Sequence, residues 1–345
     1  MNDLPFELVF EAMGALEMFN LSFATPQMWQ TIKTSIARMD PKPTLSLSLH
    51  STCHVWIQGP LNQSWRILHT RDIQAPDVEY ENAETLNING VEFKFGALLP
   101  FLPVVCVSDK PDFAAVALAE YLMDLFSCDL DNQELGSDNF YNLDAVFNSR
   151  ALRRPCNRIF VNGSSLLAQE IEKFMDEFQA NHLQIWSYIV DDFTYQKPIT
   201  ARSIYCSSAH WFTLQNLLDF GGVRVRMGNT SLRNEHFRQF IQHWLENGNK
   251  KMEVTAVESR QIIDQDLIMQ GIDIEEIDPY SVRVPFERYP SPQGFSAREI
   301  YHRGTMIRRP SDGQVASIYV QHNNCFFFIA WESFDLLPTK DYPNE

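Results

Sequence analysis

The strongest constraint on the fold is a helical repeat of apolar residues that lies between two strand-like runs. The repeat has the i, i+3, i+4, i+7 and i+8 spacing of one helix face and consists of Phe237, Phe240, Ile241, Trp244 and Leu245. Asn234 stands where a side chain can cap the first turn, and Gly248 stands where a left-handed residue can end a helix. We therefore expect a helix that begins near Asn234 and ends before Gly248.

The runs on either side of this helix, residues 223–227 and 252–256, alternate apolar and polar side chains. Alternation with a period of two is typical of a strand that is buried on one face. A strand, a helix and a returning strand predict a β-α-β unit.

Further strand-like runs precede this unit at residues 158–161, 183–186 and 203–206, and one apolar face predicts a helix at residues 167–178. The strands begin about every 20–30 residues, which is the period of leucine-rich-repeat-like β-α units. Because the consensus Leu and Asn pattern of those repeats is absent, we expect an irregular relative. Such a relative would have a curved parallel sheet, helices on one face and an extended surface for another protein.

The last block of the sequence predicts antiparallel strands. Residues 311–313 (Ser-Asp-Gly) suit a hairpin turn between strand-like runs at 306–309 and 315–320. A third run at 326–331 is apolar on both sides, which favours a central strand. Between the β-α-β unit and this block we expect a helix within residues 262–277, followed by a solvated acidic stretch.

The first forty residues suit three short helices. The first has an apolar face of Leu8, Val9, Ala12, Met13 and Leu16, the second lies near residues 19–23, and the third begins at Pro26. A bundle this small needs a partner or the following domain to bury its apolar faces.

The middle of the chain predicts an antiparallel meander. Its strand-like runs are residues 45–49, 54–57 and 65–68, followed by a pair at 91–95 and 103–107 and by a helix at 109–126.

Together these patterns predict an α+β or α/β protein. We expect a small N-terminal helical segment at residues 1–40 and a strand meander with a helix at 41–150. An irregular leucine-rich-repeat-like β-α domain is expected at 151–335, ending in an antiparallel strand group, with a tail at 336–345.

Composition excludes several classes of partner. The 345 residues include 28 Lys and Arg against 44 Asp and Glu, a formal net charge of −16. An acidic surface repels phosphates, so we expect neither nucleic acid nor a membrane as a partner. The six cysteines lack Cys-x-x-Cys spacing and are expected to be buried free thiols. With no signal peptide and no run of ~18 apolar residues, we expect a cytoplasmic or nuclear protein.

The sequence shows no catalytic, metal-binding or cofactor motif. A Gly-rich phosphate loop and a nucleophile elbow are both missing from it. Cys206 and His210 could imitate a thiol–imidazole pair, but no third orienting group is evident, so a buried structural thiol is preferred. Residues 129–134 imitate a calcium loop without its glycine. We expect no enzyme, metal or cofactor, with an enzyme of unrecognised type as a distant alternative.

Residues 209–257 resemble the type-2 F-box-associated domain of nematode F-box proteins. The matching positions are Trp211, Thr213, Leu214, Asn216, Leu217 and Leu218, then Ser231, then Phe240, Trp244, Leu245 and Gly248. A second match lies at residues 308–318, which resemble the family sequence Arg-Arg-x-Asp-Gly-x-x-Ala-Ser/Thr-Ile/Val with one extra residue before Asp312. The aromatic strand at 326–331 follows it, as in the family.

The beginning of the chain resembles an F-box. Residues 4–9 (Leu-Pro-Phe-Glu-Leu-Val) match the start of that element, and residues 20–23 (Asn-Leu-Ser-Phe) match a later part. The resemblance implies that these helices bind a Skp-type adaptor on a cullin scaffold. The apolar contact would come from Leu4, Pro5, Leu8, Val9 and Met13.

The resemblance thus implies a substrate-recognition adaptor of a cullin-based ubiquitin ligase, whose C-terminal domain binds an unknown target protein. Since the apolar stripe of the helix near residue 240 belongs to the core, the target surface is expected on outward residues around it. These are Arg224, Arg226 and Arg233, with the loop at 228–233. The alternative is a protein-interaction module with a vestigial F-box that acts outside a ligase.

Overall fold

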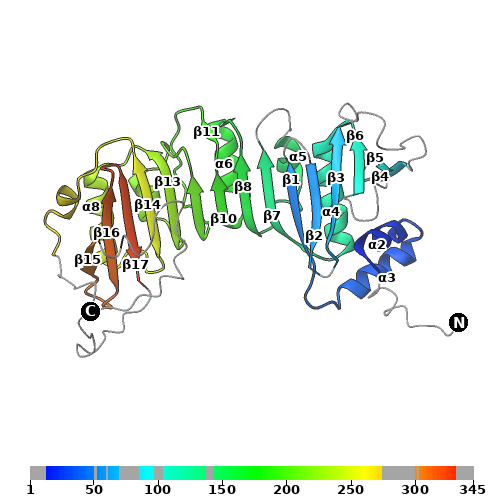
Figure 1. Ribbon diagram of the computed structural model, residues 1–345, viewed down its shortest axis with the longest axis horizontal. Coiled ribbons are helices and arrows are strands. Elements are labelled where there is room, and N and C mark those ends of the chain that lie inside the picture. Colours follow the sequence, from blue (N-terminus) through cyan, green and yellow to red (C-terminus); the bar gives the residue numbers. More distant parts are fainter. Residues whose placement is uncertain are drawn as a thin grey trace, which may run out of the picture. The chain divides into compact units, whose positions relative to one another are not determined.

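The computed structural model describes residues 13–49, 53–59, 61–69, 85–96, 104–136, 143–273, 300 and 303–331. The chain divides into two compact units, each with a β-sheet and helices against it (Figure 1). Unit 1 consists of Met1–Leu166 and Asp176–Ser187, and unit 2 consists of Leu167–Met175 and Tyr188–Glu345.

The sheet of unit 1 combines an antiparallel meander with parallel strands. Its strands are β1 (Thr44–Leu49), β2 (Cys53–Gln58), β3 (Gln63–His69), β4 (Thr85–Ile88), β5 (Val91–Gly96), β6 (Val104–Ser108), β7 (Asp129–Gly136), β8 (Cys156–Asn162) and β10 (Ala180–Ile185). Across the sheet they follow the order β10-β8-β7-β1-β2-β3-β6-β5-β4. The predicted meander is confirmed, because β1 pairs antiparallel with β2 and β2 with β3. The pairs β1–β7, β7–β8 and β8–β10 are parallel.

Helix α4 (Pro111–Leu125) packs on this sheet and contacts β1, β2 and β3. Its side chains Ala114, Leu118 and Leu122 are fully buried. The sequence predicts this helix within one or two residues of its observed bounds. A short helix, α5 (Leu143–Asn148), follows β7.

Two N-terminal helices dock on α4. They are α2 (Ala15–Ser22) and α3 (Pro26–Ile36), with Thr25 capping α3 through its side chain. The ring of Phe23 stacks on Tyr121 of α4 at 5.1 Å, and the hydroxyls of Ser22 and Tyr121 lie 2.6 Å apart. The second expected helix, near residues 19–23, corresponds to α2, which also includes Leu16 because it begins directly after the extended Gly14 (φ −76°, ψ 168°). Most of the first expected helix, including Leu8, Val9 and Ala12, lies outside the described residues.

The sheet of unit 2 has a parallel half and an antiparallel half. Its strands are β12 (Ser203–Cys206), β13 (Arg224–Thr230), β14 (Val254–Ser259), β15 (Thr305–Arg308), β16 (Val315–Gln321) and β17 (Cys325–Ala330). Across the sheet they follow the order β15-β16-β17-β14-β13-β12. The pairs β12–β13 and β13–β14 are parallel, and β14–β17, β16–β17 and β15–β16 are antiparallel. The prediction that the third C-terminal strand is central is confirmed, since β17 lies between β14 and β16.

Helix α8 (Asn234–Leu245) connects β13 to β14, which confirms the predicted β-α-β unit. Its aromatic side chains pack on β17: the Phe237 and Phe326 rings stack at 4.4 Å, and Phe240 and Trp244 meet Phe328 edge-on at 5.1 and 5.2 Å. Offset and edge-to-face geometries of this kind stabilise the core beyond simple burial.

The predicted bounds of α8 are confirmed, but both predicted capping residues need correction. The N-cap is Arg233, whose backbone N–H donates to Nδ1 of His236, and Asn234 is the first helical residue. At the other end the left-handed residue is Asn247 (φ 78°). Gly248 is required for a different reason, because a Cβ there would lie 2.4 Å from the ring of His243 and 2.7 Å from its carbonyl oxygen.

The remaining helices of the described residues are α6 (Ala168–Glu177), α7 (Leu214–Leu218) and α9 (Gln265–Met269), and two short strands are β9 (Ser165–Leu166) and β11 (Tyr188–Ile189). The helix expected within residues 262–277 is confirmed as α9, which ends two residues before Gly271, where the backbone is left-handed (φ 77°). The acidic stretch from residue 274 onward lies outside the described residues. The leucine-rich-repeat-like character of the β-α region stays a prediction.

Candidate functional site

The two faces of the unit 2 sheet have different characters. Val225 and Met227 on β13 are 1 % exposed and lie on the face that α8 covers. Arg224 and Arg226 alternate with them and therefore lie on the other face. Tyr205 of β12 pairs with Arg226 in the parallel register and shares that face. The structure thus brings two of the three predicted arginines together on one strand face.

Arg226 lies over an aromatic ring on this face. Its guanidinium carbon is 4.8 Å from the ring centroid of Tyr205, a cation–π contact. Burial raises the pKa of Tyr205, and the charge of Arg226 opposes that increase. The pKa of Cys325 is raised first by burial and then by the negative charge of Glu258, while Arg226 lowers it. Arg226 and the carboxylate of Glu258 thus act with opposite sign on the same two groups, Tyr205 and Cys325.

Arg224 is ion-paired at the start of the same strand. Its Nε and Nη2 atoms contact Oε2 of Glu253 at 3.0 and 2.9 Å. The side chain is 37 % exposed, so the pair is at the surface, where such pairs add about 0–1 kcal/mol to stability. Arg224 and Arg226 are half-exposed, so their guanidinium groups can bind hydrogen-bond acceptors. Across β14 and β17 the same face carries a buried apolar cluster that includes Ala256 and Phe327.

Arg233 lies apart from the other two arginines. It is the exposed N-cap of α8, beyond the far end of β13, whose seven residues span about 20 Å from the position of Arg224. Only the second half of the predicted loop at residues 228–233 lies outside a strand, because Gly228 to Thr230 belong to β13. Side-chain bonds hold this end: Arg260 donates to Asn229 at 2.7 Å and Thr230 donates to the carbonyl of Glu258 at 3.0 Å.

The residues that carry the family resemblance form the scaffold of this face. Trp211 is 1 % exposed and stacks on Phe193 with ring centroids 5.6 Å apart. Thr213 caps α7, and its backbone N–H donates to Oδ1 of Asn216 at 2.9 Å. Asn216 donates in turn to the carbonyl of Tyr195 at 2.8 Å. These bonds explain why Trp, Thr and Asn occur at this spacing.

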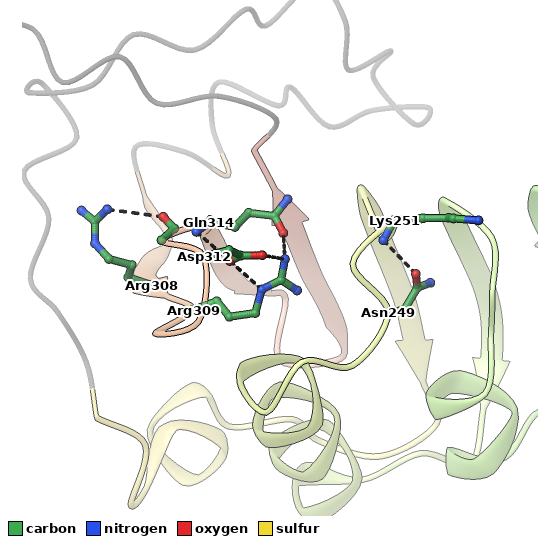
Figure 2. Close-up of polar contacts among 7 residues, drawn as sticks. Asn249, Lys251, Arg308, Arg309, Asp312 and Gln314 are labelled. Carbon is green, nitrogen blue, oxygen red and sulfur yellow. Dashed lines mark hydrogen bonds and ion pairs between the residues drawn. The ribbon is translucent and has the colours of Figure 1, made fainter.

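The second family-like sequence is also structural. Arg309 is 1 % exposed and forms a two-bond fork to Asp312 at 2.9 and 2.8 Å, with Gln314 also accepting from it. Figure 2 shows these three side chains joined on the hairpin, across from Asn249 and Lys251. The guanidinium carbon lies 4.6 Å from the ring centroid of Trp244. The cluster therefore joins the β15–β16 hairpin to the end of α8.

Most of the residues expected to contact an adaptor are not among the described residues. Leu4, Pro5, Leu8 and Val9 lie outside the described residues, and Met13 is half-buried just before α2. Their contact with an adaptor stays a prediction.

The residues considered as candidates for catalysis or metal binding have structural roles. Burial raises the pKa of Cys206 to about 12, and its thiol donates to the carbonyl of Ser208 at 3.4 Å. His210 instead faces residues 191 and 192, with Nε2 at 3.0 Å from the carbonyl oxygen of Asp191. Residues 129–134 are part of strand β7, so they form no calcium loop. Within the described residues, His, Cys, Asp and Glu form no group of three or more that could hold a metal ion.

Sequence reasoning does not name Tyr205 as part of the site. The signal was present, because the alternation in residues 203–206 places Ser203 and Tyr205 on the face opposite to the buried Ile204 and Cys206. Its pairing with Arg226 depends on the register between two strands that are far apart in the sequence, which no local pattern encodes.

Comparison with known families gives one match. Residues 195–257 match the family model described as F-box associated. This segment includes β12, α7, β13 and α8 and reaches into β14. F-box-associated regions occur in adaptor and interaction proteins, in which they point to substrate binding. No curated protein and no solved structure matches the chain. Among the described residues, no helix has the length and apolarity needed to span a membrane.

Proposed function

We propose that this chain selects a target protein for a cullin-based ubiquitin ligase. Unit 2 would bind the target, and the residues before α2 would bind a Skp-type adaptor. The observation that carries the proposal is the F-box-associated match over residues 195–257, which coincides with the strands that display Arg224 and Arg226.

The burial pattern of unit 2 supports target binding on the face of β12 and β13 that carries Tyr205, Arg224 and Arg226, called the β12–β13 face. Most of the large side chains that carry the family resemblance are buried in the fold, so they are poor candidates for contacts with a partner; they are Trp211, Leu217, Phe240 and Trp244. Arg224 and Arg226 on β13 and Tyr205 on β12 remain half-exposed. Arginine and tyrosine are enriched among the residues that dominate protein interfaces. The face would suit a target segment that offers carboxylate or carbonyl oxygens.

Affinity capture with paired variants tests both halves of the proposal. Leu8→Asp with Val9→Asp should remove the adaptor and cullin from the captured complex and leave the target bound. Arg224→Glu with Arg226→Glu should remove the target and leave the adaptor bound. Arg202→Glu, an exposed arginine of the same unit outside the strand face, is the matched control and should change neither. If both double variants capture the same proteins as the wild type, the proposal is wrong.

A second candidate is an interaction module that acts outside a ligase. One observation favours it: α2 and α3 pack on α4 of the same chain, so the described part of the N-terminal segment already has a partner. In that case capture would yield a target that depends on Arg224 and Arg226, and neither adaptor nor cullin would accompany it.

A further inference from the structure

Unit 2 exposes a group of large apolar side chains away from the β12–β13 face. Leu167, Tyr188 and Val190 are 49 %, 55 % and 54 % exposed. Single exposed apolar residues are common on any protein surface and need no explanation. Three in one place are a stronger sign of a contact surface.

A hydrogen bond joins the two segments that carry these three side chains. The backbone N–H of Ala168, next to Leu167, donates to Oδ2 of Asp191, next to Val190, at 3.2 Å. Tyr188 and Val190 flank the fully buried Ile189, so they project to the same, outer side of their extended segment, which includes strand β11 (Tyr188–Ile189). The residues therefore form one patch at the beginning of α6.

Acidic residues surround this apolar patch. Glu170 accepts from the backbone N–H of Leu167 at 2.8 Å, and Glu172 is exposed one position beyond the buried Ile171. Asp191 and Asp192 follow Val190, and the side chain of Asp192 is fully exposed. The basic His210 contacts Asp191 and Asp192, and Lys173 lies on α6. The net charge of −16 for the whole chain adds to the local negative potential.

We propose that Leu167, Tyr188 and Val190 form a docking surface for a basic segment of a partner protein. The segment would place aliphatic or aromatic side chains on the patch and lysine or arginine residues against the carboxylates of Glu172, Asp191 and Asp192. The argument for this occupant is charge complementarity, because acidic groups around an apolar centre attract a positive partner and repel an acidic one. The surface uses none of the residues of the β12–β13 face, so it does not depend on the proposed ligase function.

Fluorescence anisotropy with defined peptides tests the surface in the full-length protein. The probes share one apolar core of leucine and phenylalanine and differ only in their flanks, which are lysine, serine or glutamate. We expect the lysine-flanked peptide to bind and the glutamate-flanked peptide to bind at least about tenfold more weakly. Raising the salt concentration from about 0.05 M to 0.5 M should weaken the lysine-flanked complex, because exposed charges are screened.

Variants locate the binding on the patch. Tyr188→Ser with Val190→Ser should weaken binding at least about tenfold, and Asp192→Lys should weaken it severalfold while leaving the apolar residues intact. Ile262→Ser with Leu267→Ser is the matched control, since those side chains are 78 % and 50 % exposed outside the patch. Circular dichroism verifies that each variant is folded.

Three outcomes would overturn the proposal: equal binding of all three peptides, no binding of any, or equal losses in the patch and control variants. Sedimentation of the wild type tests whether a second copy of this chain occupies the patch instead. If the protein self-associates and the Tyr188→Ser and Val190→Ser variant is a monomer, the patch is an interface between copies of this chain and the proposal is wrong. None of these results bears on target capture through Arg224 and Arg226.

Discussion

Arg309 is the clearest case of a charged residue whose role is structural. It is almost fully buried, with its charge balanced by Asp312 and its plane against Trp244. A buried cation is tolerated only where partners replace the water that it loses. The pairing of Arg309 with Asp312 is therefore explained by the junction between the hairpin and α8.

The two hydrogen bonds from Arg309 to Asp312 should contribute measurably to the free energy of unfolding. We expect Arg309→Lys to lower the free energy of unfolding by about 2 kcal/mol, because lysine cannot make two parallel bonds or lie flat on Trp244. Urea denaturation measures the change. The control is Arg308→Lys, at a half-buried side chain that donates to the carbonyl of Gly313 at 3.4 Å, with an expected effect within about 0.5 kcal/mol. Equal effects at the two positions would contradict this assignment.

The same cluster predicts a pH dependence. The pKa of Asp312 is lowered, first by the hydrogen bonds from Arg309. A carboxyl group with a lowered pKa in the folded state stabilises the fold above its ordinary pKa of about 4, and this contribution is lost as the pH falls through the folded-state value. We therefore expect the Tm difference between wild type and Asp312→Asn to be largest above about pH 5 and to shrink between about pH 4 and pH 2. A difference that stays constant over that range would show that the charge of Asp312 is irrelevant.

At the scale of elements, the short helix α7 depends on one amide side chain. Asn216 is 5 % exposed, accepts from the backbone of Thr213 and donates to the carbonyl of Tyr195. We expect Asn216→Ala to lower the free energy of unfolding by about 2 kcal/mol, because it removes a cap and leaves a buried carbonyl without its donor. Thermal unfolding followed by circular dichroism tests this. Gln215→Ala is the matched control on the exposed side of α7 and should change stability by less than about 0.5 kcal/mol.

The elements that sequence predicts well are those with a strong period. The apolar stripe of α8, the alternation of β13 and the turn at residues 311–313 each depend on local geometry, so the β-α-β unit and the C-terminal hairpin are predicted. The exact ends of helices and strands are harder to predict from the sequence, because they depend on tertiary contacts. Strand β14 begins at Val254 and extends to Ser259, since β13 and β17 pair along both of its edges. A structural role for Gly248 is predicted correctly, but the reason predicted for it is wrong.

The candidate site is predicted in part for the same reason. The period of two places Arg224 and Arg226 on one face, but Arg233 lies beyond the strand and does not join them. Tyr205 and the patch of Leu167, Tyr188 and Val190 come from segments that meet only through strand register or a backbone hydrogen bond. Contacts between distant segments are properties of the fold, and they cannot be predicted from a single sequence.

At the scale of the molecule, the N-terminal helices bear most directly on the proposed function. Phe19 is fully buried, with its ring centroid 5.8 Å from those of both Trp65 and Tyr121. These contacts fix α2 on unit 1, directly after the residues expected to bind an adaptor. A helical segment of this size buries too little surface to fold alone. Adaptor binding should therefore depend on this docking.

This dependence gives a prediction that joins stability to function. Tyr121→Ala removes the ring that stacks on Phe23 at 5.1 Å and contacts Phe19, and it also removes the hydroxyl beside Ser22. We expect faster limited proteolysis between α3 and β1, with adaptor capture reduced severalfold, because the released helices no longer hold the preceding residues in a binding conformation. Tyr121→Phe keeps both ring contacts and removes only the hydroxyl, so it should retain most of the capture. If Tyr121→Ala releases the helices and leaves adaptor capture unchanged, the adaptor-binding residues fold independently of unit 1. If the wild type captures no adaptor at all, the interaction module outside a ligase becomes the better description.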